Sequence, residues 1–193
     1  EAGNAKDSVW AYPSLVLGLV AFFVYVGVEV IAGDTIINYG VSQGFSQDVA
    51  KIFTTYTLYG MLAGYVIGIF FIPKYLSQQK ALNYSAILGV LFSIGAITFT
   101  GFMSVLCLAL LGLANALMWP ALWPLAINGL GKFTKIGSAF IIMMISGGAL
   151  MPLLYGKIAD QIGNTQSAYL ILIPCYLFIY YYATIGHKKS SWK

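Results

Sequence analysis

Between Lys80 and Lys132 the chain carries no charged residue over roughly 50 positions, and this run constrains the fold more than any other feature. A helix needs about 20 apolar residues to cross a bilayer, so the run is too long for one span and long enough for two. It must fold back, and the segment 98–101 is the best turn. Of all 193 residues, 60% are hydrophobic and 8% charged, whereas soluble domains have about a quarter charged. Lipid is therefore the expected solvent.

The remaining apolar blocks are each close to the length of a membrane-spanning helix. Charged residues separate them, among them Lys51, Lys74 and Lys157. We expect six transmembrane helices, at about residues 12–39, 52–72, 82–99, 103–127, 136–155 and 168–186. In this prediction a cytoplasmic linker (1–11) precedes the transmembrane bundle (12–186), and a cytoplasmic tail (187–193) follows it. The predicted fold class is an all-α membrane protein.

The lysines predict the orientation of the bundle. All ten basic residues are lysines, and an even number of spans puts both termini on one side of the membrane. Eight of the ten fall on that side, whereas only Lys51 and Lys157 reach the other. Because lysine is enriched in cytoplasmic loops, both termini are placed in the cytoplasm. The net charge of +4 reflects this topology and does not indicate a nucleic-acid partner.

Motifs for catalysis are absent from the sequence. No Gly-rich phosphate loop of the Walker type occurs, and there is no Ser/His/Asp set and no metal-ligand spacing. The single histidine, His187, stands beside lysines, and Cys107 and Cys175 both lie inside apolar runs. We therefore expect no enzyme activity, no metal site and no cofactor.

An acidic residue, Glu29, interrupts the middle of the first apolar block. An ionised carboxylate in hydrocarbon is costly, and it is kept where it faces a water-filled cavity, carries a proton or holds a polar substrate. Glu29 lies about one helical turn past the middle of the span, too deep for its short side chain to reach water. We predict a role in substrate binding or ion coupling; the alternative is a structural hydrogen bond to a neighbouring helix.

A second acid, Asp34, occupies a different face of the same helix. It lies about 140° around the helix from Glu29, so the two acids are not expected to line one cavity. Asn38 shares its face, because four residues separate the two. Asp34 is also nearer the outer interface, where a solvated acid is unremarkable. We treat Asp34 as a candidate for coupling or gating, and Asn38 as a candidate substrate contact.

The fourth span carries a stripe of one amide and two indoles. Asn115, Trp119 and Trp123 recur every four residues and therefore share a helix face. A sugar has apolar C–H faces that stack on aromatic rings, and hydroxyls that need amide or carboxylate partners. A stripe of this kind facing Glu29 would suit a monosaccharide. The alternative is that the two indoles pack the bundle or meet lipid, but an amide rarely faces lipid.

Glycine and proline weaken the fifth span. Gly147, Gly148 and Pro152 stand near its middle, and interrupted helices line cavities in transporters. We predict a coupling or gating role for these three residues.

Three segments match a known family in the correct order along the chain. The first is Tyr25–Asp34 with Asn38 and Tyr39. The second comprises residues 120–131 with 134–138, and the third comprises residues 147–152 with Gly156 and Asp160. They resemble the seventh, tenth and eleventh helices of the fucose–galactose–glucose:proton symporter family of the major facilitator superfamily. Glucose/galactose transporters of bacterial inner membranes are the most similar subset.

The resemblance implies a fold of two six-helix bundles that hold the substrate between them and rock to alternate access. This chain resembles the C-terminal bundle, with a 3+3 inverted repeat, so the N-terminal six-helix bundle is an expected partner that is missing here. In such a repeat the first and fourth helices are equivalent cavity-lining elements. The position of Trp119 is similar to an aromatic cavity residue of the family.

The leading hypothesis is half of a proton-coupled monosaccharide importer of the glucose, galactose or fucose class, in the bacterial cytoplasmic membrane. Two alternatives stay open. The chain could belong to a facilitator, or to a symporter of another small polar solute. It could also be a non-transporting membrane fragment or scaffold.

Overall fold

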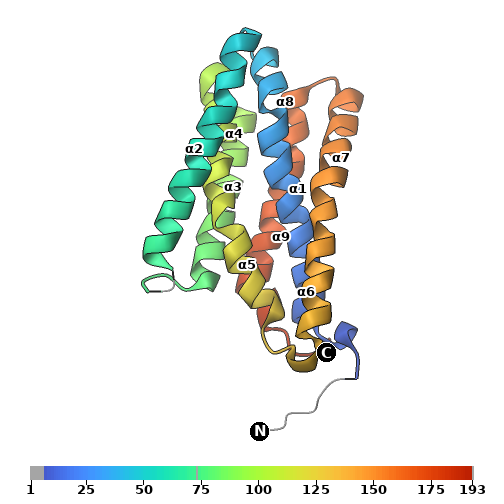
Figure 1. Ribbon diagram of the computed structural model, residues 1–193. Coiled ribbons are helices and arrows are strands. Elements are labelled where there is room, and N and C mark those ends of the chain that lie inside the picture. Colours follow the sequence, from blue (N-terminus) through green and yellow to red (C-terminus); the bar gives the residue numbers. More distant parts are fainter. Residues whose placement is uncertain (1–6, 73, 193) are drawn as a thin grey trace.

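The computed structural model describes residues 7–72 and 74–192, and it is built of helices that run up and down one bundle (Figure 1). Six helical segments are long and apolar enough to cross a membrane: Pro13–Ser42, Gln47–Phe71, Gln78–Thr98, Gly101–Ile127, Gly131–Ile162 and Thr165–Lys188. The predicted all-α class with six spans is confirmed. Of the predicted linker and tail, residues 1–6 and 193 lie outside the described part of the chain.

The first three spans are each one continuous helix. They are α1 (Pro13–Ser42), α2 (Gln47–Phe71) and α3 (Gln78–Thr98). The chain turns at Phe99 and Thr100, inside the segment expected to fold back. α2 begins several residues before position 52 because Ser46 caps it, accepting from the Val49 amide, and helix geometry continues past the apolar block.

The last three spans are each divided. The fourth consists of α4 (Gly101–Ala116) and α5 (Met118–Ile127). The fifth has η2 (Gly131–Phe133), α6 (Thr134–Met143), η3 (Met144–Ser146) and α7 (Gly147–Ile162). The sixth has α8 (Thr165–Ala168), η4 (Tyr169–Ile171), α9 (Leu172–Thr184) and η5 (Gly186–Lys188), and η1 (Val9–Ala11) precedes α1.

The break between α4 and α5 follows from proline. Pro120 lacks the amide hydrogen that would bond the Ala116 carbonyl, so the helix cannot continue through Leu117. A new helix can start there, because the first turn of a helix has no use for that hydrogen. The fifth helix also runs further than the predicted 136–155, to Ile162, where Gly163 ends it with a left-handed φ of 68°.

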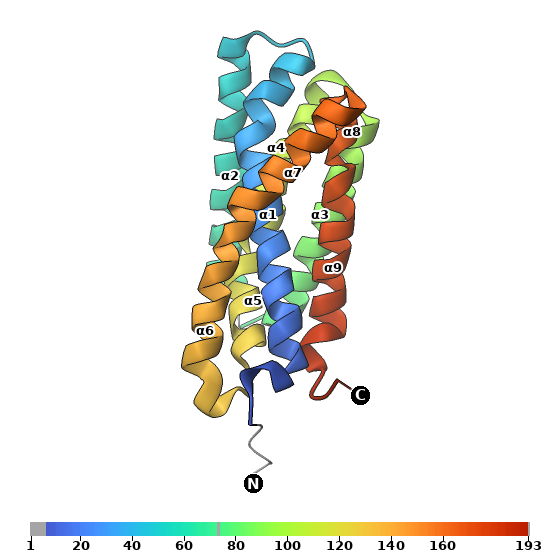
Figure 2. The same ribbon diagram turned by 90° about the vertical axis from the view of Figure 1, so that its right-hand side faces the viewer.

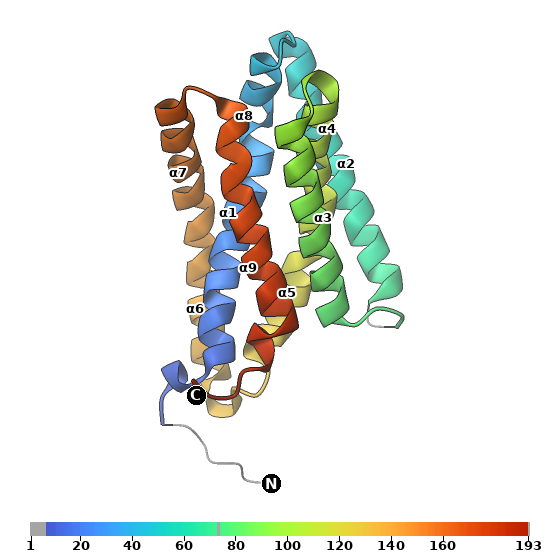
Figure 3. The ribbon, with the colours of Figure 1, turned by 180° about the vertical axis from the view of Figure 1, so that it is seen from behind.

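The first span forms the centre of the bundle. α1 packs against α2, α4, α5, α7 and α9, and it is the most buried span, followed by the α4–α5 span. α7 runs obliquely across α1 (Figure 2), and α3 and α9 pack together on the far side (Figure 3). α2 approaches α4 closely, since a Cβ at Gly64 would stand 2.6 Å from the Ala116 Cβ.

A glutamine clamp, formed by Gln43 and Gln166, ties the end of the bundle opposite the termini. The Gln166 Nε2 lies 2.9, 3.0 and 2.6 Å from the carbonyl oxygens of Ala96, Ile97 and Phe99, at the carboxyl end of α3. These carbonyls have no partner within their own helix. The Gln43 Oε1 accepts from the Gly101 amide at 2.7 Å. The clamp thereby holds α1, the α3–α4 turn and α8 together.

Candidate functional site

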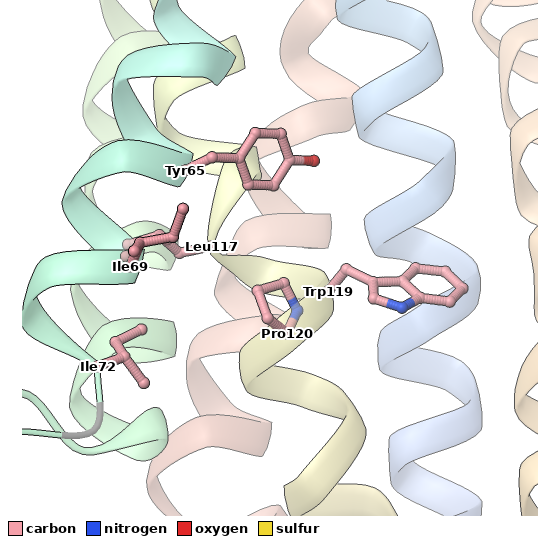
Figure 4. Close-up of a pocket in the computed structure, with 7 residues that line it drawn as sticks. Tyr65, Ile69, Ile72, Leu117, Trp119 and Pro120 are labelled. Carbon is pink, nitrogen blue, oxygen red and sulfur yellow. The ribbon is translucent and has the colours of Figure 1, made fainter.

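Two indoles extend from α5 toward α1. The rings of Trp119 and Trp123 stack with centroids 6.0 Å apart, and both side chains are half-buried. Phe22 of α1 meets them edge-on, at 5.1 Å from Trp119 and 6.1 Å from Trp123. Figure 4 shows Trp119 pointing from α5 toward α1. The stripe expected from the sequence is therefore partly a packing surface against α1.

Glu29 lies next to this aromatic group. Its side chain is half-buried, and it interacts electrostatically with Tyr25 of its own helix, Tyr65 of α2 and Tyr176 of α9. The Tyr25 ring also lies 6.3 Å from the Trp119 ring, centroid to centroid. The acid and the indoles are thus joined through Tyr25, as expected if they form one site.

A cavity of about 580 Å³ opens between α2 and the α4–α5 break (Figure 4). Its walls are mostly apolar, and Tyr65 and Trp119 are the two aromatic residues among them. The apolar lining continues along both helices: Gly68, Ile69, Ile72, Leu117 and Pro120. A mostly apolar space of this size with a few polar groups is typical of a small-molecule site. Tyr65 and Trp119 connect it to Glu29.

Asn115 stands behind this cavity and does not line it. It is 1% exposed, and its Oδ1 accepts a hydrogen bond of 2.9 Å from the Tyr176 hydroxyl. The amide oxygen expected to face a sugar is therefore already used. Asn115 holds Tyr176, and Tyr176 lies within electrostatic range of Glu29.

Asp34 and Asn38 lie apart from the site. Both are exposed, whereas Thr35 between them hydrogen-bonds the Tyr169 hydroxyl at 2.6 Å. Neither Asp34 nor Asn38 lines the cavity beside Glu29. This separation agrees with the helical angle between the two acids, and the structure does not bring Asn38 to the other candidate substrate contacts.

Gly147 and Gly148 mark the place where α7 crosses α1. A Cβ on Gly147 would collide with the Phe23 carbonyl, and one on Gly148 would stand 3.0 Å from Val30. Pro152 follows inside α7, and the short 3₁₀ turn η3 precedes the crossing. The two glycines lie at a helix–helix contact, and none of the three residues lies in the cavity wall.

Sequence reasoning missed four aromatic residues of the site. Tyr25 and Phe22 precede Glu29 by four and seven residues, so helical spacing alone could have found them. Tyr65 and Tyr176 come from other spans, and their approach depends on which helices pack together. Among residues 7–72 and 74–192, no group of three or more His, Cys, Asp or Glu residues is placed to hold a metal ion.

No family model matches the chain, but the curated proteins that it resembles are named as sugar transporters. The chain is 35% identical over 187 residues to the glucose/galactose transporter of Brucella abortus biovar 1 (strain 9-941), covering 95% of this chain and 45% of that protein. It is 29% identical over 175 residues to the L-fucose-proton symporter of Escherichia coli (strain K12), covering 90% of this chain and 40% of that protein.

A solved structure shares the fold. The crystal structure of FucP, a major facilitator superfamily transporter in the outward conformation, matches 88% of this chain with a TM-score of 0.84 and 27% identity, and the match covers 41% of FucP. The chain has the fold of a major facilitator superfamily transporter and is similar to the fucose–galactose–glucose:proton symporter family.

The relatives in this symporter family are named as transporters and not as enzymes, which agrees with the expectation from the sequence. The six apolar spans and the similarity to these transporters together show that the chain is a multi-pass membrane protein. The chain spans less than half the length of these relatives, 45% of the Brucella protein and 40% of the Escherichia protein.

Proposed function

We propose that this chain forms the C-terminal six-helix bundle of a secondary active sugar transporter, which takes up a monosaccharide by alternating access with a second bundle. The observation that carries the proposal is the junction of Glu29, Tyr25 and Trp119 beside a cavity of about 580 Å³. The names of the relatives, which mention glucose, galactose and L-fucose, support a hexose as substrate.

The chemistry of the site suits a sugar ring. The C–H face of a pyranose can stack on the indole of Trp119, while its hydroxyls donate to the Glu29 carboxylate or exchange hydrogen bonds with the Tyr65 hydroxyl. The Trp123 ring stacks on the Trp119 ring and supports it. Asn115 acts through Tyr176, which it positions near Glu29.

Proton coupling is part of the proposal. A half-buried carboxyl in the membrane can take up and release a proton as its surroundings change, and Glu29 is the acid in this position. The relative named as an L-fucose-proton symporter supports a proton as the coupling ion. Asp34 and Asn38 lie outside the cavity, and Gly147 and Gly148 lie at the crossing of α7 over α1, so we assign these two glycines to the movement of α1 against α7.

Uptake of labelled glucose, galactose and fucose by the full-length protein in proteoliposomes tests the site. Trp119→Ala removes the stacking surface and is expected to weaken sugar affinity by about tenfold. Glu29→Gln is expected to abolish accumulation against a gradient. Tyr84→Ala and Asp48→Asn serve as matched controls, since both residues are exposed and lie outside the cavity lining. Unchanged affinity and accumulation in both site variants would contradict the assignment.

The coupling ion is tested in the same vesicles. Collapse of the proton gradient with an ionophore is expected to stop accumulation while leaving equilibration of the sugar intact. If accumulation persists without a proton gradient and requires sodium, the protein is a symporter of another ion. If no accumulation occurs under any gradient, it is a facilitator.

A further inference from the structure

A second, smaller cavity lies at the end of the bundle where the described chain begins and ends. It has a volume of about 230 Å³, and its walls come from three parts of the fold: the start of α1, the loop after α5 and the C-terminal segment. The residues that matter for its chemistry are Tyr12, Ser14, Asn128, His187, Lys188 and Lys189. It shares no lining residue with the cavity beside Tyr65 and Trp119.

The cavity is basic. Lys188, Lys189 and His187 line it, and no acidic residue belongs to its described lining. A further cation stands close by, because the Lys132 Nζ lies 5.1 Å from the centre of the Phe133 ring, and Phe133 packs edge-on against Tyr12 at 6.0 Å. Cations gathered around a hollow of this kind attract an anion.

Most polar groups of the cavity can donate hydrogen bonds, and His187 is the exception because its Nδ1–H is already used. The His187 Nδ1 lies 3.0 Å from the Tyr182 carbonyl oxygen, and since a carbonyl can only accept, Nδ1 carries the hydrogen and the ring is held in place. The Ser14 hydroxyl, the Asn128 amide and the lysine ammonium groups can all donate. These donors and the lysine ammonium groups match the oxygens of a phosphate group, although the Lys189 Nζ rests 5.8 Å from the centre of the Tyr181 ring and must swing from it to reach the ligand.

The flanking tryptophans indicate the depth of the cavity in the membrane. The Trp192 Nε1 donates to the Trp10 carbonyl oxygen at 3.1 Å, and the two side chains are 60% and 52% exposed. Exposed indoles gather at the level of the lipid headgroups. Lys188 and Lys189 therefore lie where a headgroup, and not a buried solute, is the neighbour.

We propose that this cavity binds the phosphate group of an anionic phospholipid. Basic pockets at the ends of membrane helices bind headgroups of this charge. The bound lipid would join α1, the loop after α5 and the C-terminal segment, since each of them contributes to the wall.

The test measures thermal unfolding of the full-length protein in detergent, with added phosphatidylglycerol, phosphatidylcholine or inorganic phosphate. Phosphatidylglycerol is expected to raise the unfolding midpoint, and phosphatidylcholine is not. The Lys188→Gln/Lys189→Gln variant is expected to bind phosphatidylglycerol about fivefold more weakly for each lysine removed. The Lys188→Arg/Lys189→Arg variant keeps both charges and is expected to keep the binding.

The matched control is Lys74→Gln/Lys80→Gln, which removes the same charge from the turn between α2 and α3. It is expected to bind phosphatidylglycerol like the unmodified protein. An equal loss in this control would show that the lipid senses diffuse surface charge, and would overturn the proposal. The proposal would also be overturned if phosphatidylcholine or inorganic phosphate raised the unfolding midpoint as much as phosphatidylglycerol does. Lys188 and Lys189 are exposed, so their replacement should leave the fold intact. The unfolding midpoint of each variant without added lipid checks this.

Discussion

At Glu29, a carboxyl group inside a membrane-spanning helix hydrogen-bonds Tyr25 of α1 and lies within electrostatic range of Tyr65 of α2 and Tyr176 of α9. Phenolic hydroxyls can donate to a carboxylate or accept from a protonated carboxyl, so the group has partners in either state. This environment distinguishes Glu29 from Asp34, which is exposed on another face of the same helix.

The hydrogen bond between Tyr176 and Asn115 gives a prediction at the scale of single residues. Tyr176→Phe leaves the Asn115 amide oxygen buried without its donor, and is expected to reduce the stability of the protein by about 1–3 kcal/mol. Thermal or denaturant unfolding of the full-length protein measures the loss. Tyr180→Phe, an exposed tyrosine on the same helix, is the control and should have little effect.

A double variant separates the hydrogen bond from the packing of the ring. Replacing both partners by apolar groups, as Asn115→Leu/Tyr176→Phe, should recover part of the lost stability, because no buried polar group is then left unpaired. If Tyr176→Phe is as stable as the unmodified protein, the amide does not depend on Tyr176.

At the scale of the elements, the contact between α1 and α7 depends on missing side chains. Gly147→Ala places a methyl group against the Phe23 carbonyl and forces the two helices apart. The expected cost is about 1–3 kcal/mol of stability. If α7 slides along α1 during transport, the variant should also lose transport. Gly156→Ala lies in the same helix with no neighbour within 4 Å of the added methyl group, and it should be tolerated.

The elements show how far the sequence predicts the structure. Hydrophobic length predicts six spans and the turn near 98–101, because both follow from the thickness of a bilayer. It does not predict that α2 begins at Gln47, since charged residues end the apolar block but not the helix. Nor does it predict the 3₁₀ turn at Met144–Ser146, which contains neither glycine nor proline.

For the candidate site, contacts within one helix could be predicted from the sequence, whereas contacts between helices could not. Spacing along one helix separates Glu29 from Asp34 and places Trp119 with Trp123, and the structure agrees with both expectations. Spacing cannot say that the Asn115 amide meets Tyr176, because that contact joins residues 61 positions apart. Contacts between spans depend on which helices are neighbours, and a single sequence does not state this.

At the scale of the whole molecule, the orientation in the membrane can be measured. We expect both termini and the α2–α3 turn in the cytoplasm. In a background without Cys107 and Cys175, Lys74→Cys should resist a membrane-impermeant maleimide in intact cells, whereas Gln161→Cys should react. Both positions are exposed, so accessibility reports the side of the membrane. The opposite labelling pattern would invert the predicted orientation.

The break at Leu117 has a mechanical consequence for the whole bundle. Trp119 comes two residues after it, so the indole moves with the lower half of the span and not with the upper half. A tilt of α5 against α4 at this break would displace the indole from its contacts with Phe22 and Tyr25 of α1 and change the cavity that Trp119 lines. The break thereby couples the shape of the pocket to the tilt of a single helix segment.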